Sequence, residues 1–519
     1  MLRIQTLIVP IVLAAILAAC GATARVTTAS ASTDMEAIVQ DDGQLRANPD
    51  RALSTFKLLG VDRIRMFVQW WEIAPNPYRR KAPKHFNATD PGAYRHANWA
   101  TLDTAIQKAM AMGINVDLTL TGPAPYWATG PHQPCCGPRL QWEPNSFQFR
   151  LFVQAVGRRY SGSYHGLPRV TFWSVWNEPN YGPDLAPQAI NNSSVETSPA
   201  LYRQLLDSAW KGLGNSGHGN DTILFGELAP RGFGSPPAFP GNFAGMRPLQ
   251  FLRALYCVDK NYNRLRGNAA SERGCPTSGG AAAFRAAHPA LFQAGGFAAH
   301  PYPQGQPPNV LTSNEPDFAD LPALPALARL LDRLQGIWGS GKQFDIWSTE
   351  YGYQTRPPDM RLRQPSPATA AYYLNWAEYI SYRNPRIKSF MQYLLVDPPL
   401  GNFPSALEFK NGSHKATFDA WRLPLYMPVT STGHGNTLEV WGDVRPADLF
   451  PTGSSQVQIE FQPGSHGAWQ TVATPSFDSR GYFDTRVTFP ASGSVRLTWA
   501  YPSPLGYAIH SRTQSITVH

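Results

Sequence analysis

Eight apolar runs rich in β-branched and aromatic residues alternate with helical stretches between residues 35 and 424. The runs begin at Glu36, Asp62, Ile114, Val170, Thr222, Gly295, Gln343 and Ser389. Such alternation is typical of a parallel α/β fold, and eight repeats of it predict a (β/α)8 TIM barrel over residues 35–424. The alternative is a doubly wound open sheet, which usually has a glycine-rich phosphate loop after its first strand, and the sequence contains none there.

The helices between these runs have recognisable ends. Asn48-Pro49 opens one helix, which Gly60 closes, and Gly113 follows another. The remaining helices are predicted at Ala100–Met112, from Ser146, and at Pro199–Leu213, Leu321–Trp338 and Pro367–Tyr382. The segment from Ser146 has the spacing of an amphipathic helix, because Phe149, Phe152, Val153, Val156 and Tyr160 share one face.

The pattern changes after Pro424. From Thr437 onward, short β-rich segments alternate with turns every eight to twelve residues, without a helical period. This predicts that residues 425–519 form an all-β sandwich of the immunoglobulin or fibronectin kind. Such a domain either binds glycan or acts as a spacer, and we favour the spacer because no clear row of exposed aromatic residues is visible in its sequence.

The N-terminal segment has the features of an export signal. One basic residue, Arg3, precedes an apolar run that is too short and wrongly flanked for a stable spanning helix. The sequence Leu17-Ala-Ala-Cys20 resembles the lipobox of bacterial lipoproteins, which implies a signal peptide over residues 1–20 and a lipidated Cys20. Ordinary secretion with cleavage after residues 22–24 is the alternative. Residues 21–34 are small and polar and predict a flexible tether to an extracytoplasmic protein.

The charge pattern argues against a nucleic-acid partner. The formal net charge is +9, but no run of five or more Lys or Arg residues occurs. We therefore expect a diffusely basic surface, no nucleic-acid binding, and contact with the membrane only through a lipid anchor at Cys20. The 15 tryptophans are either core residues or flat platforms for sugar or base rings.

Four cysteines remain when Cys20 is set aside. These are Cys135, Cys136, Cys257 and Cys275, and three pairings are open. Cys257 with Cys275 would close a short loop, whereas the adjacent pair Cys135 and Cys136 would be strained. No Cys/His spacing matches a zinc site, so we expect disulfides, no metal and no cofactor.

Polar and aromatic residues gather where the predicted strands end. In a barrel of this kind the reacting groups lie at the C-terminal ends of the strands. The candidate site residues are Arg65, Trp70, Trp127, Asn177, Glu178, Glu227, His300, Tyr302, Glu350 and Tyr353.

Two of these candidates, Glu178 and Glu350, are carboxylates at the ends of the fourth and seventh strands. These strands lie nearly opposite each other across the barrel mouth. Cleavage of a glycosidic bond needs one carboxylic acid to protonate the leaving oxygen and one carboxylate to attack or to activate water. A pair that flanks a cleft supplies both, and a retaining reaction would place the carboxyl groups about 5 to 5.5 Å apart.

The motif Trp176-Asn-Glu-Pro-Asn180, together with Ser348-Thr-Glu-Tyr351, resembles the clan A glycoside hydrolases. The likeness is greatest to glycoside hydrolase family 39, with family 5 and other clan members as neighbours. It implies that Glu178 is the acid/base, that Glu350 is the nucleophile, and that Asn177 binds the 2-hydroxyl of the reacting sugar. By the same resemblance, Arg65, His300 and Tyr302 support the carboxylates and hold the sugar.

Several of the candidates have a second interpretation. Glu227 is either a sugar ligand or an ion-pair partner of a barrel arginine, and we favour the supporting role. Trp70 and Trp127 are either core residues or sugar platforms. Glu143 stands in a similar sequence, Trp142-Glu-Pro-Asn145, but we interpret it as a residue at the start of a helix.

The family pattern often has a tryptophan on the eighth strand. Met391, Gln392 and Tyr393 stand there in this chain, which departs from the pattern.

These features together predict a secreted or lipid-anchored retaining glycoside hydrolase that acts on an oligo- or polysaccharide, of the β-xylosidase, β-glucosidase or related glycanase kind. Two alternatives stay open at this point. One is a transglycosylase that uses the same residues, and the other is a non-catalytic carbohydrate-binding surface protein.

Overall fold

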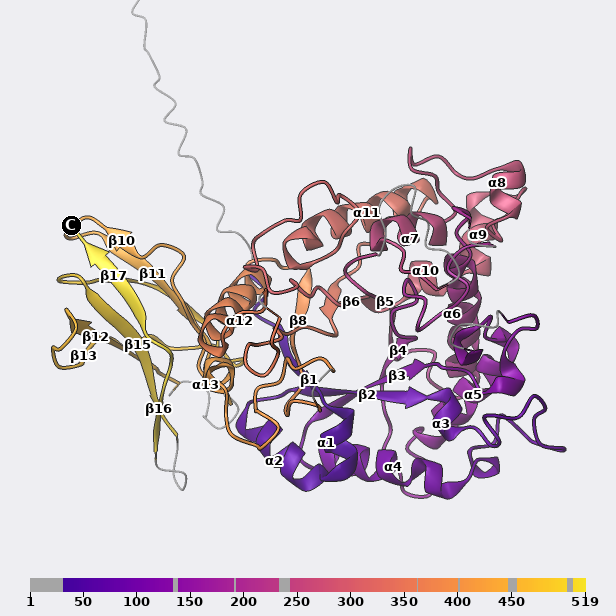
Figure 1. Ribbon diagram of the computed structural model, residues 1–519, viewed down its shortest axis with the longest axis horizontal. Helices are drawn as coiled ribbons and strands as arrows, with labels where there is room; N and C mark the ends of the chain where they lie inside the picture. The colour runs from indigo at the N-terminus through magenta and orange to yellow at the C-terminus, as the bar shows by residue number, and fades with distance from the viewer. Residues whose placement is uncertain are drawn as a thin grey trace, which may run out of the picture.

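The computed structural model describes residues 31–133, 139–190, 193–232, 243–361, 363–399, 402–446, 455–501 and 507–519. Its larger part is a closed barrel of eight parallel strands in sequence order (Figure 1). The strands are β1 (Glu36–Gln40), β2 (Arg63–Gln69), β3 (Asn115–Thr121), β4 (Phe172–Val175), β5 (Thr222–Leu228), β6 (Gly296–Ala299), β7 (Ile346–Ser348) and β8 (Ile387–Tyr393). The barrel closes where Glu36–Gln40 pairs with Ser389–Tyr393. The predicted (β/α)8 fold is confirmed.

Helices surround the strands, and several start at the residues that the sequence indicated. The α-helices are α1 (Asp42–Ala47), α2 (Pro49–Leu58), α3 (Trp70–Ile73), α4 (His96–Ala111), α5 (Ser146–Arg159), α6 (Ser198–Asn215), α7 (Pro248–Leu255), α8 (Gly267–Ser271), α9 (Ala281–Ala287), α10 (Ala290–Gln293), α11 (Leu324–Ile337), α12 (Pro367–Tyr382) and α13 (Ala416–Arg422). The short 3-10 helices are η1 (Pro91–Ala93), η2 (Tyr126–Ala128), η3 (Arg139–Gln141) and η5 (Leu321–Ala323). The side chains of Asn48, Asn145 and Ser366 cap α2, α5 and α12 by accepting backbone N–H bonds.

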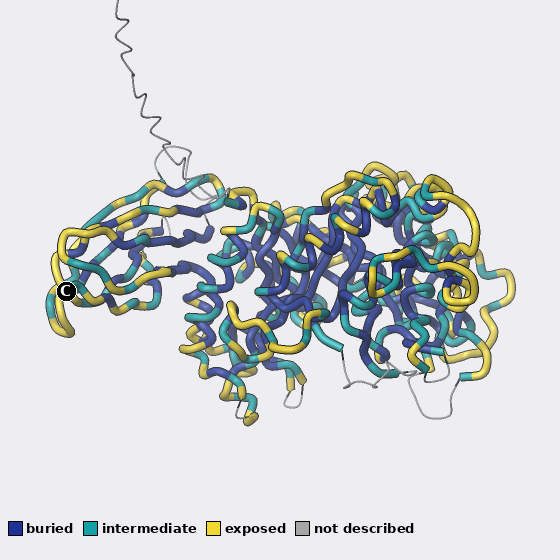
Figure 2. The backbone as a smooth tube through the Cα atoms, turned by 90° about the horizontal axis from the view of Figure 1, so that it is seen from above, coloured by how far each residue is buried: buried dark blue, intermediate teal, exposed yellow. Residues whose placement is uncertain are grey.

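The core of the barrel lies between the strands and the helices, where Figure 2 shows most of the buried chain. Trp70, Trp99, Trp173 and Trp176 are each fully buried within it. Burial of one such side chain contributes roughly 1.5 to 3 kcal/mol, so these tryptophans stabilise the core. For them, core filling is the correct interpretation.

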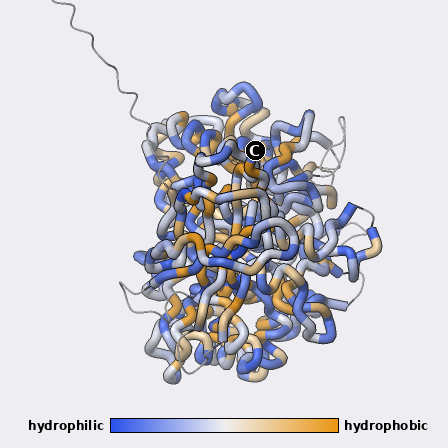
Figure 3. Tube along the Cα trace, turned by 90° about the vertical axis from the view of Figure 1, so that its left-hand side faces the viewer, coloured by the Kyte–Doolittle hydropathy of each residue, from blue (hydrophilic) through white to orange (hydrophobic). Residues whose placement is uncertain are grey.

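The C-terminal region forms the predicted β-sandwich. Its strands are β9 (Leu425–Tyr426), β10 (Ser431–Thr432), β11 (Thr437–Gly442), β12 (Gln458–Pro463), β13 (Gln470–Ala473), β14 (Phe483–Thr488), β15 (Gly493–Ala500), β16 (Ala508–His510) and β17 (Gln514–Val518). One sheet has the order β10-β17-β15-β12-β13 with β16 beside β15, and the other has the order β14-β11-β9. A separate apolar cluster lies between them. Seen from this end of the molecule, apolar and polar stretches are interspersed along the trace (Figure 3).

The sandwich packs directly on α12 and α13 of the barrel. Buried Arg445 forms ion pairs with Glu378 on α12 and with Asp443, and it donates a hydrogen bond to the carbonyl of Trp421 on α13 at 2.6 Å. The Tyr426 ring stacks on Trp376 with 5.7 Å between centroids. These contacts dock the sandwich on the barrel.

The N-terminal end of the described chain is held against the barrel. Ser32 is buried, and its N–H donates to the carbonyl of Tyr382 at 2.8 Å. The last residues of the predicted tether, 31–34, therefore belong to the packed domain, because this backbone bond fixes them. Cys20 and the signal segment lie outside the described residues, and no helix in the described part of the chain is long and apolar enough to cross a membrane.

Cys257 and Cys275 form a disulfide between the segment after α7 and the segment after α8, with their Cα atoms 5.7 Å apart. Cys135 and Cys136 lie outside the described residues.

Candidate active site

The loop that follows β4 is held in an unusual backbone conformation. Trp176 and Glu178 have φ angles of +69° and +38°, in the left-handed region that side chains other than glycine rarely adopt. The Glu178 N–H donates to the carbonyl of Glu227 at 2.9 Å, and the Asn180 amide bonds both to the backbone of Ala229 and to the carbonyl of Met246. These bonds fasten the Asn-Glu-Pro-Asn segment to the end of β5. Backbone strain that is held in this way is typical of functional sites.

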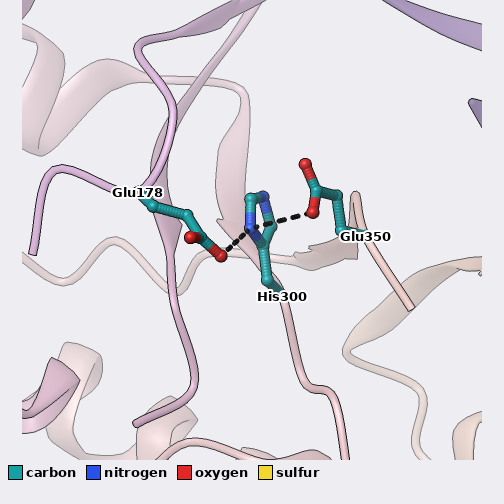
Figure 4. Close-up of side chains that lie close together, drawn as sticks. All are labelled: Glu178, His300 and Glu350. Carbon is teal, nitrogen blue, oxygen red and sulfur yellow. Dashed lines mark hydrogen bonds and ion pairs between the residues drawn. The ribbon is translucent and has the colours of Figure 1, made fainter. Parts of the chain in front are cut away.

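Glu178 and Glu350 face each other in one cavity of about 490 Å³ at the C-terminal ends of the strands. Figure 4 shows their carboxylates on either side of the His300 imidazole. One oxygen of Glu178, one nitrogen of His300 and one oxygen of Glu350 all lie within 4.8 Å of one another. The cavity is lined by Phe67, Asn177, Glu178, Tyr181, Ala229, Pro230, Arg231, Gly232, Tyr302, Gln304, Glu350, Tyr393 and Phe403.

The Glu350 carboxylate is surrounded by hydrogen-bond donors. Arg65 donates to Glu350 Oε1 at 2.7 Å, and the Tyr302 hydroxyl donates to Oε2 at 3.0 Å. Arg65 is fully buried, and its other arm forms a 2.7 Å ion pair with Glu227. A fixed guanidinium and a phenol hydroxyl stabilise the negative charge of Glu350.

Glu178 is more open, since its side chain is 20% exposed. It accepts a 3.0 Å hydrogen bond from His300 Nδ1, whereas His300 Nε2 lies 2.7 Å from Glu227 Oε2. Both imidazole nitrogens thus face carboxylates. Burial lowers the pKa of His300, but the charges of Glu350, Glu178 and Glu227 outweigh that effect and raise its pKa to about 10.

Glu227 is the buried centre of this network. It accepts hydrogen bonds from Arg65 and His300 at 2.7 Å and from Thr349 at 2.9 Å. Burial by itself raises the pKa of Glu227. Arg65 and His300 outweigh this effect and lower the pKa to about 2. Glu227 is inaccessible and is an ion-pair partner, as the supporting interpretation expects.

Glu178, His300 and Glu350 have the donor types and the spacing of a metal site. A histidine that binds a metal must be neutral, with a free lone pair on the nitrogen that faces the ion. His300 instead has a raised pKa and a carboxylate at each nitrogen. This arrangement fits a proton-carrying imidazolium better than a metal ligand.

The predicted site residues fall into three groups. Asn177, Glu178, Tyr302 and Glu350 line the cavity, and Arg65, His300 and Glu227 lie beneath them. Trp70, Trp127 and Tyr353 lie outside the cavity lining.

Trp70 is fully buried and stacks on Phe152 with 5.7 Å between ring centroids. The half-buried Trp127 packs edge-on against Trp70 and donates its indole N–H to the carbonyl of Pro75 at 3.0 Å. Of the two interpretations, the core role is the correct one for Trp70, which the short helix α3 turns into the core. Trp127 packs against Trp70 and does not line the cavity.

Tyr353 is buried as well, and its hydroxyl donates to the carbonyl of Gln306 at 3.1 Å. It does not line the cavity, so the structure does not place this candidate residue in the site.

Some lining residues were missed by sequence reasoning. Phe67 follows Arg65 by two positions on β2, so the alternation of a strand could have placed it on the same inner face. Tyr393 ends β8, and it is one of the three residues that sequence analysis named where the family pattern often has tryptophan. Phe403 lies in an irregular loop that carries no comparable signal. Asp184 was missed as well; it does not line the cavity, but its carboxylate accepts a 3.4 Å hydrogen bond from the Asn177 amide. Burial and the adjacent Glu178 raise the pKa of Asp184 well above its usual range.

No protein-family profile and no curated protein matches the sequence. Several solved structures resemble the chain. A family 39 glycoside hydrolase from Bacteroides cellulosilyticus is 15% identical with a TM-score of 0.46, and the match covers 88% of this chain and 79% of that one. A family 30 endoxylanase from Clostridium papyrosolvens is 12% identical with a TM-score of 0.44, covering 89% and 96%.

A β-glucuronidase from Bacteroides uniformis is also similar, at 12% identity and a TM-score of 0.40. The match covers 94% of this chain but only 46% of that protein, so the chain spans about half its length. Because these TM-scores lie below 0.5, the function proposed next rests on the geometry of the site.

Proposed function

We propose that this protein is a retaining glycoside hydrolase, with Glu178 as the acid/base and Glu350 as the nucleophile. The observation that carries the proposal is the pair of facing carboxylates in one cavity, with an oxygen of each within 4.8 Å of the other. Retaining enzymes hold their carboxyl groups about 5 to 5.5 Å apart, whereas inverting enzymes leave roughly 6.5 to 9.5 Å for a water molecule. The short gap supports retention.

The surroundings of the two carboxylates support the division of roles. Glu350 accepts hydrogen bonds from Arg65 and Tyr302, which hold its carboxylate in the cavity. Glu178 is more exposed and contacts the imidazole of His300, so it is free to exchange a proton with a leaving group. An attacking carboxylate needs the first environment, and a general acid needs the second.

The reaction would proceed in two displacements. Glu350 attacks the anomeric carbon while Glu178 gives a proton to the leaving oxygen, so the glycosidic bond breaks and a glycosyl ester forms. Glu178 then takes a proton from water, and the hydroxide oxygen displaces Glu350 from the sugar. Asn177 has its amide oriented by Arg65 at 3.2 Å and by Asp184, which suits the predicted bond to the sugar 2-hydroxyl.

His300 would orient Glu178 through a charged hydrogen bond. Its Nδ1 lies 3.0 Å from Glu178 Oε1, and its raised pKa keeps the imidazole charged at neutral pH. Because an imidazolium with a raised pKa keeps its proton, the proton that Glu178 gives to the leaving oxygen comes from solvent, through the exposed side of Glu178. Glu227 holds the other nitrogen and keeps the ring in place.

The proposal can be tested with 2,4-dinitrophenyl 2-deoxy-2-fluoro glycosides of glucose, xylose, galactose and mannose. The fluorine slows hydrolysis of the glycosyl ester, so intact mass spectrometry should detect an adduct and peptide mapping should place it on Glu350. The variant Glu350→Gln should form none. The matched control Glu272→Gln changes an exposed glutamate and should react like the wild type.

Other outcomes would contradict parts of the proposal. An adduct on Glu178 would reverse the two roles, and inversion seen by NMR of a turned-over substrate would overturn retention. Sugar binding without turnover, unchanged in Glu178→Ala and Glu350→Ala, would favour a carbohydrate-binding protein. Transfer to an added sugar in preference to water would identify a transglycosylase with the same site.

We also propose that the protein is exported and anchored through lipidation of Cys20, as the lipobox-like sequence suggests. Expression of the full chain in a bacterium with labelled palmitate should give a labelled membrane protein. A Cys20→Ala variant should lose the label and leave the membrane fraction. Label retained by that variant would overturn the anchor.

A further inference from the structure

A second cavity, of about 710 Å³, adjoins the active site at the ends of β1 and β8. It is lined in part by Asp41, Gly43, Gln44, Leu394, Val396 and Lys410. Its volume falls in the range that small-molecule sites occupy. The two cavities share Tyr393 and Phe403 in their walls, so they are neighbouring compartments of one cleft.

The shared wall leads from the nucleophile to the second cavity. The Tyr302 hydroxyl bonds to Glu350, and the Tyr302 ring packs edge-on against Phe403 with 5.0 Å between centroids. Phe403 in turn lies 6.1 Å from the ring of Tyr393. Tyr393 lines both cavities and so lies between them. A ligand that lies along these rings would reach both compartments.

The floor of the second cavity is rigid. The carboxylate of Asp41 accepts a hydrogen bond from the Gln44 N–H at 3.0 Å and two more from the N–H groups of Leu395 and Val396 at 3.1 Å. This joins the start of α1 to the end of β8. A wall fixed in this way can hold a ligand without first being ordered.

Two polar side chains at this cavity are available to a ligand. Gln44 is half-buried and Lys410 is exposed. Among the described residues, neither the Gln44 amide nor the Lys410 ammonium has a hydrogen-bond or ion-pair partner. Aromatic faces beside free amide and ammonium donors are the groups that bind sugar rings and hydroxyls.

The position of the second cavity decides which part of a glycan it can take. Glu178 lies after β4 and protonates the leaving oxygen, so the leaving group belongs on the side of β4 and β5, where Tyr181 and Arg231 line the wall. The second cavity lies on the other side of Glu350, beyond β8. It therefore faces the sugar that the enzyme retains on Glu350.

We propose that the second cavity binds a further sugar unit on the glycone side, so that the substrate is an oligo- or polysaccharide with at least two units on that side of the cleaved bond. This inference rests on the proposed glycosidase function. It deepens that function, because an enzyme that uses such a subsite releases a disaccharide or longer product and does not trim single terminal sugars.

The test compares 4-nitrophenyl glycosides that differ by one glycone unit. The pairs are xyloside and xylobioside, glucoside and cellobioside, and mannoside and mannobioside, all in the β configuration. For the sugar that is cleaved, kcat/KM should be at least tenfold higher for the diglycoside, which corresponds to about 1.4 kcal/mol of binding in the second cavity.

Variants then locate the gain. Gln44→Ala and Lys410→Ala should remove most of this advantage while kcat/KM for the monoglycoside stays unchanged. Gln107→Ala on α4 and Lys211→Ala on α6 change exposed residues of the same types and serve as matched controls. Thermal unfolding of all four variants should match the wild type.

Two results would overturn the inference alone, and a third would overturn the proposed function as well. Equal kcat/KM values for the paired substrates, or an equal loss on both in the Gln44 and Lys410 variants, would overturn the subsite and leave the glycosidase intact. Release of nitrophenol from none of the pairs, together with no fluoroglycoside adduct, would overturn the proposed function and the subsite with it.

Discussion

Glu227 offers a sharp test of the buried network, through the substitution Glu227→Gln. The change keeps the shape of the side chain but removes its charge. Arg65 and His300, which both lie 2.7 Å from the carboxylate and are fully buried, then lose one of their counter-ions. Removal of one partner from a buried ion pair typically costs 3 to 5 kcal/mol. Because the amide oxygen still accepts a hydrogen bond, we expect a loss near the lower end, about 3 kcal/mol.

The pH dependence of this loss has a defined sign. The pKa of Glu227 is lowered from 4.5 to about 2, so the stability that this group contributes is fully present above pH 4.5. It is lost as the pH falls toward 2, because the carboxylate then takes up a proton in the folded state as well. The difference in free energy of unfolding between wild type and variant should therefore be largest near pH 6 and shrink below pH 4.5.

Urea unfolding followed by tryptophan fluorescence at several pH values measures this difference. Glu272→Gln, an exposed glutamate, is the control and should change stability by less than about 0.5 kcal/mol. A Glu227→Gln variant that is as stable as the wild type, with a raised KM instead, would refute the reasoning. It would show that Glu227 contacts the sugar, which was the other interpretation of this residue.

Four further predictions concern other parts of the molecule. Glu178→Ala should lower kcat by roughly 10²- to 10⁴-fold on glycosides with poor leaving groups and much less on dinitrophenyl glycosides, and an equal loss on both would argue against its role as the acid. The pKa of His300 is raised from 6.5 to about 10, so its contribution to stability is complete below pH 6.5 and is lost as the pH rises through 10. The free energy of unfolding, measured from pH 6 to 10, should show this decline in the wild type but not in His300→Gln. Arg445→Met, at the buried junction, should lower the free energy of unfolding by about 3 to 5 kcal/mol and split the calorimetric transition in two, whereas a single unshifted transition would contradict the docking role. Replacing Cys257 and Cys275 by serine should cost about 3 kcal/mol, since the bridge closes a loop with a sequence separation of 18; unchanged urea unfolding would show that the bridge adds no stability.

The strand order and the two main carboxylates were predictable because both depend on short-range patterns. Each barrel strand is an apolar run bounded by turn residues, and a closed parallel barrel brings all strand ends to one face. Glu178 and Glu350 could be paired from sequence because each follows a buried strand directly. The helix starts at Pro49, Ser146 and Pro367 were predictable for a similar reason, since capping residues act on their immediate neighbours.

The errors arose where the direction of a side chain depends on a local bend. Trp70 follows β2, but the helix α3 begins at that residue and turns its ring toward Phe152. Tyr353 follows Glu350 by three residues, yet it is buried outside the cavity lining and its hydroxyl bonds to the backbone of Gln306. Neither orientation leaves a periodic signal in the sequence.

The sequence alone determined the class of fold, the division into barrel and sandwich, and the residue types that meet at the barrel mouth, because periodicity and strand ends are local properties. Only the tertiary structure decided how those residues share charge. Arg65 contacts both Glu227 and Glu350, and these three residues are separated by 162 and 285 positions along the chain. Burial and distances of a few ångströms set the protonation of His300 and Glu227, and the second cavity beside Tyr393 exists only because β1 and β8 meet when the barrel closes.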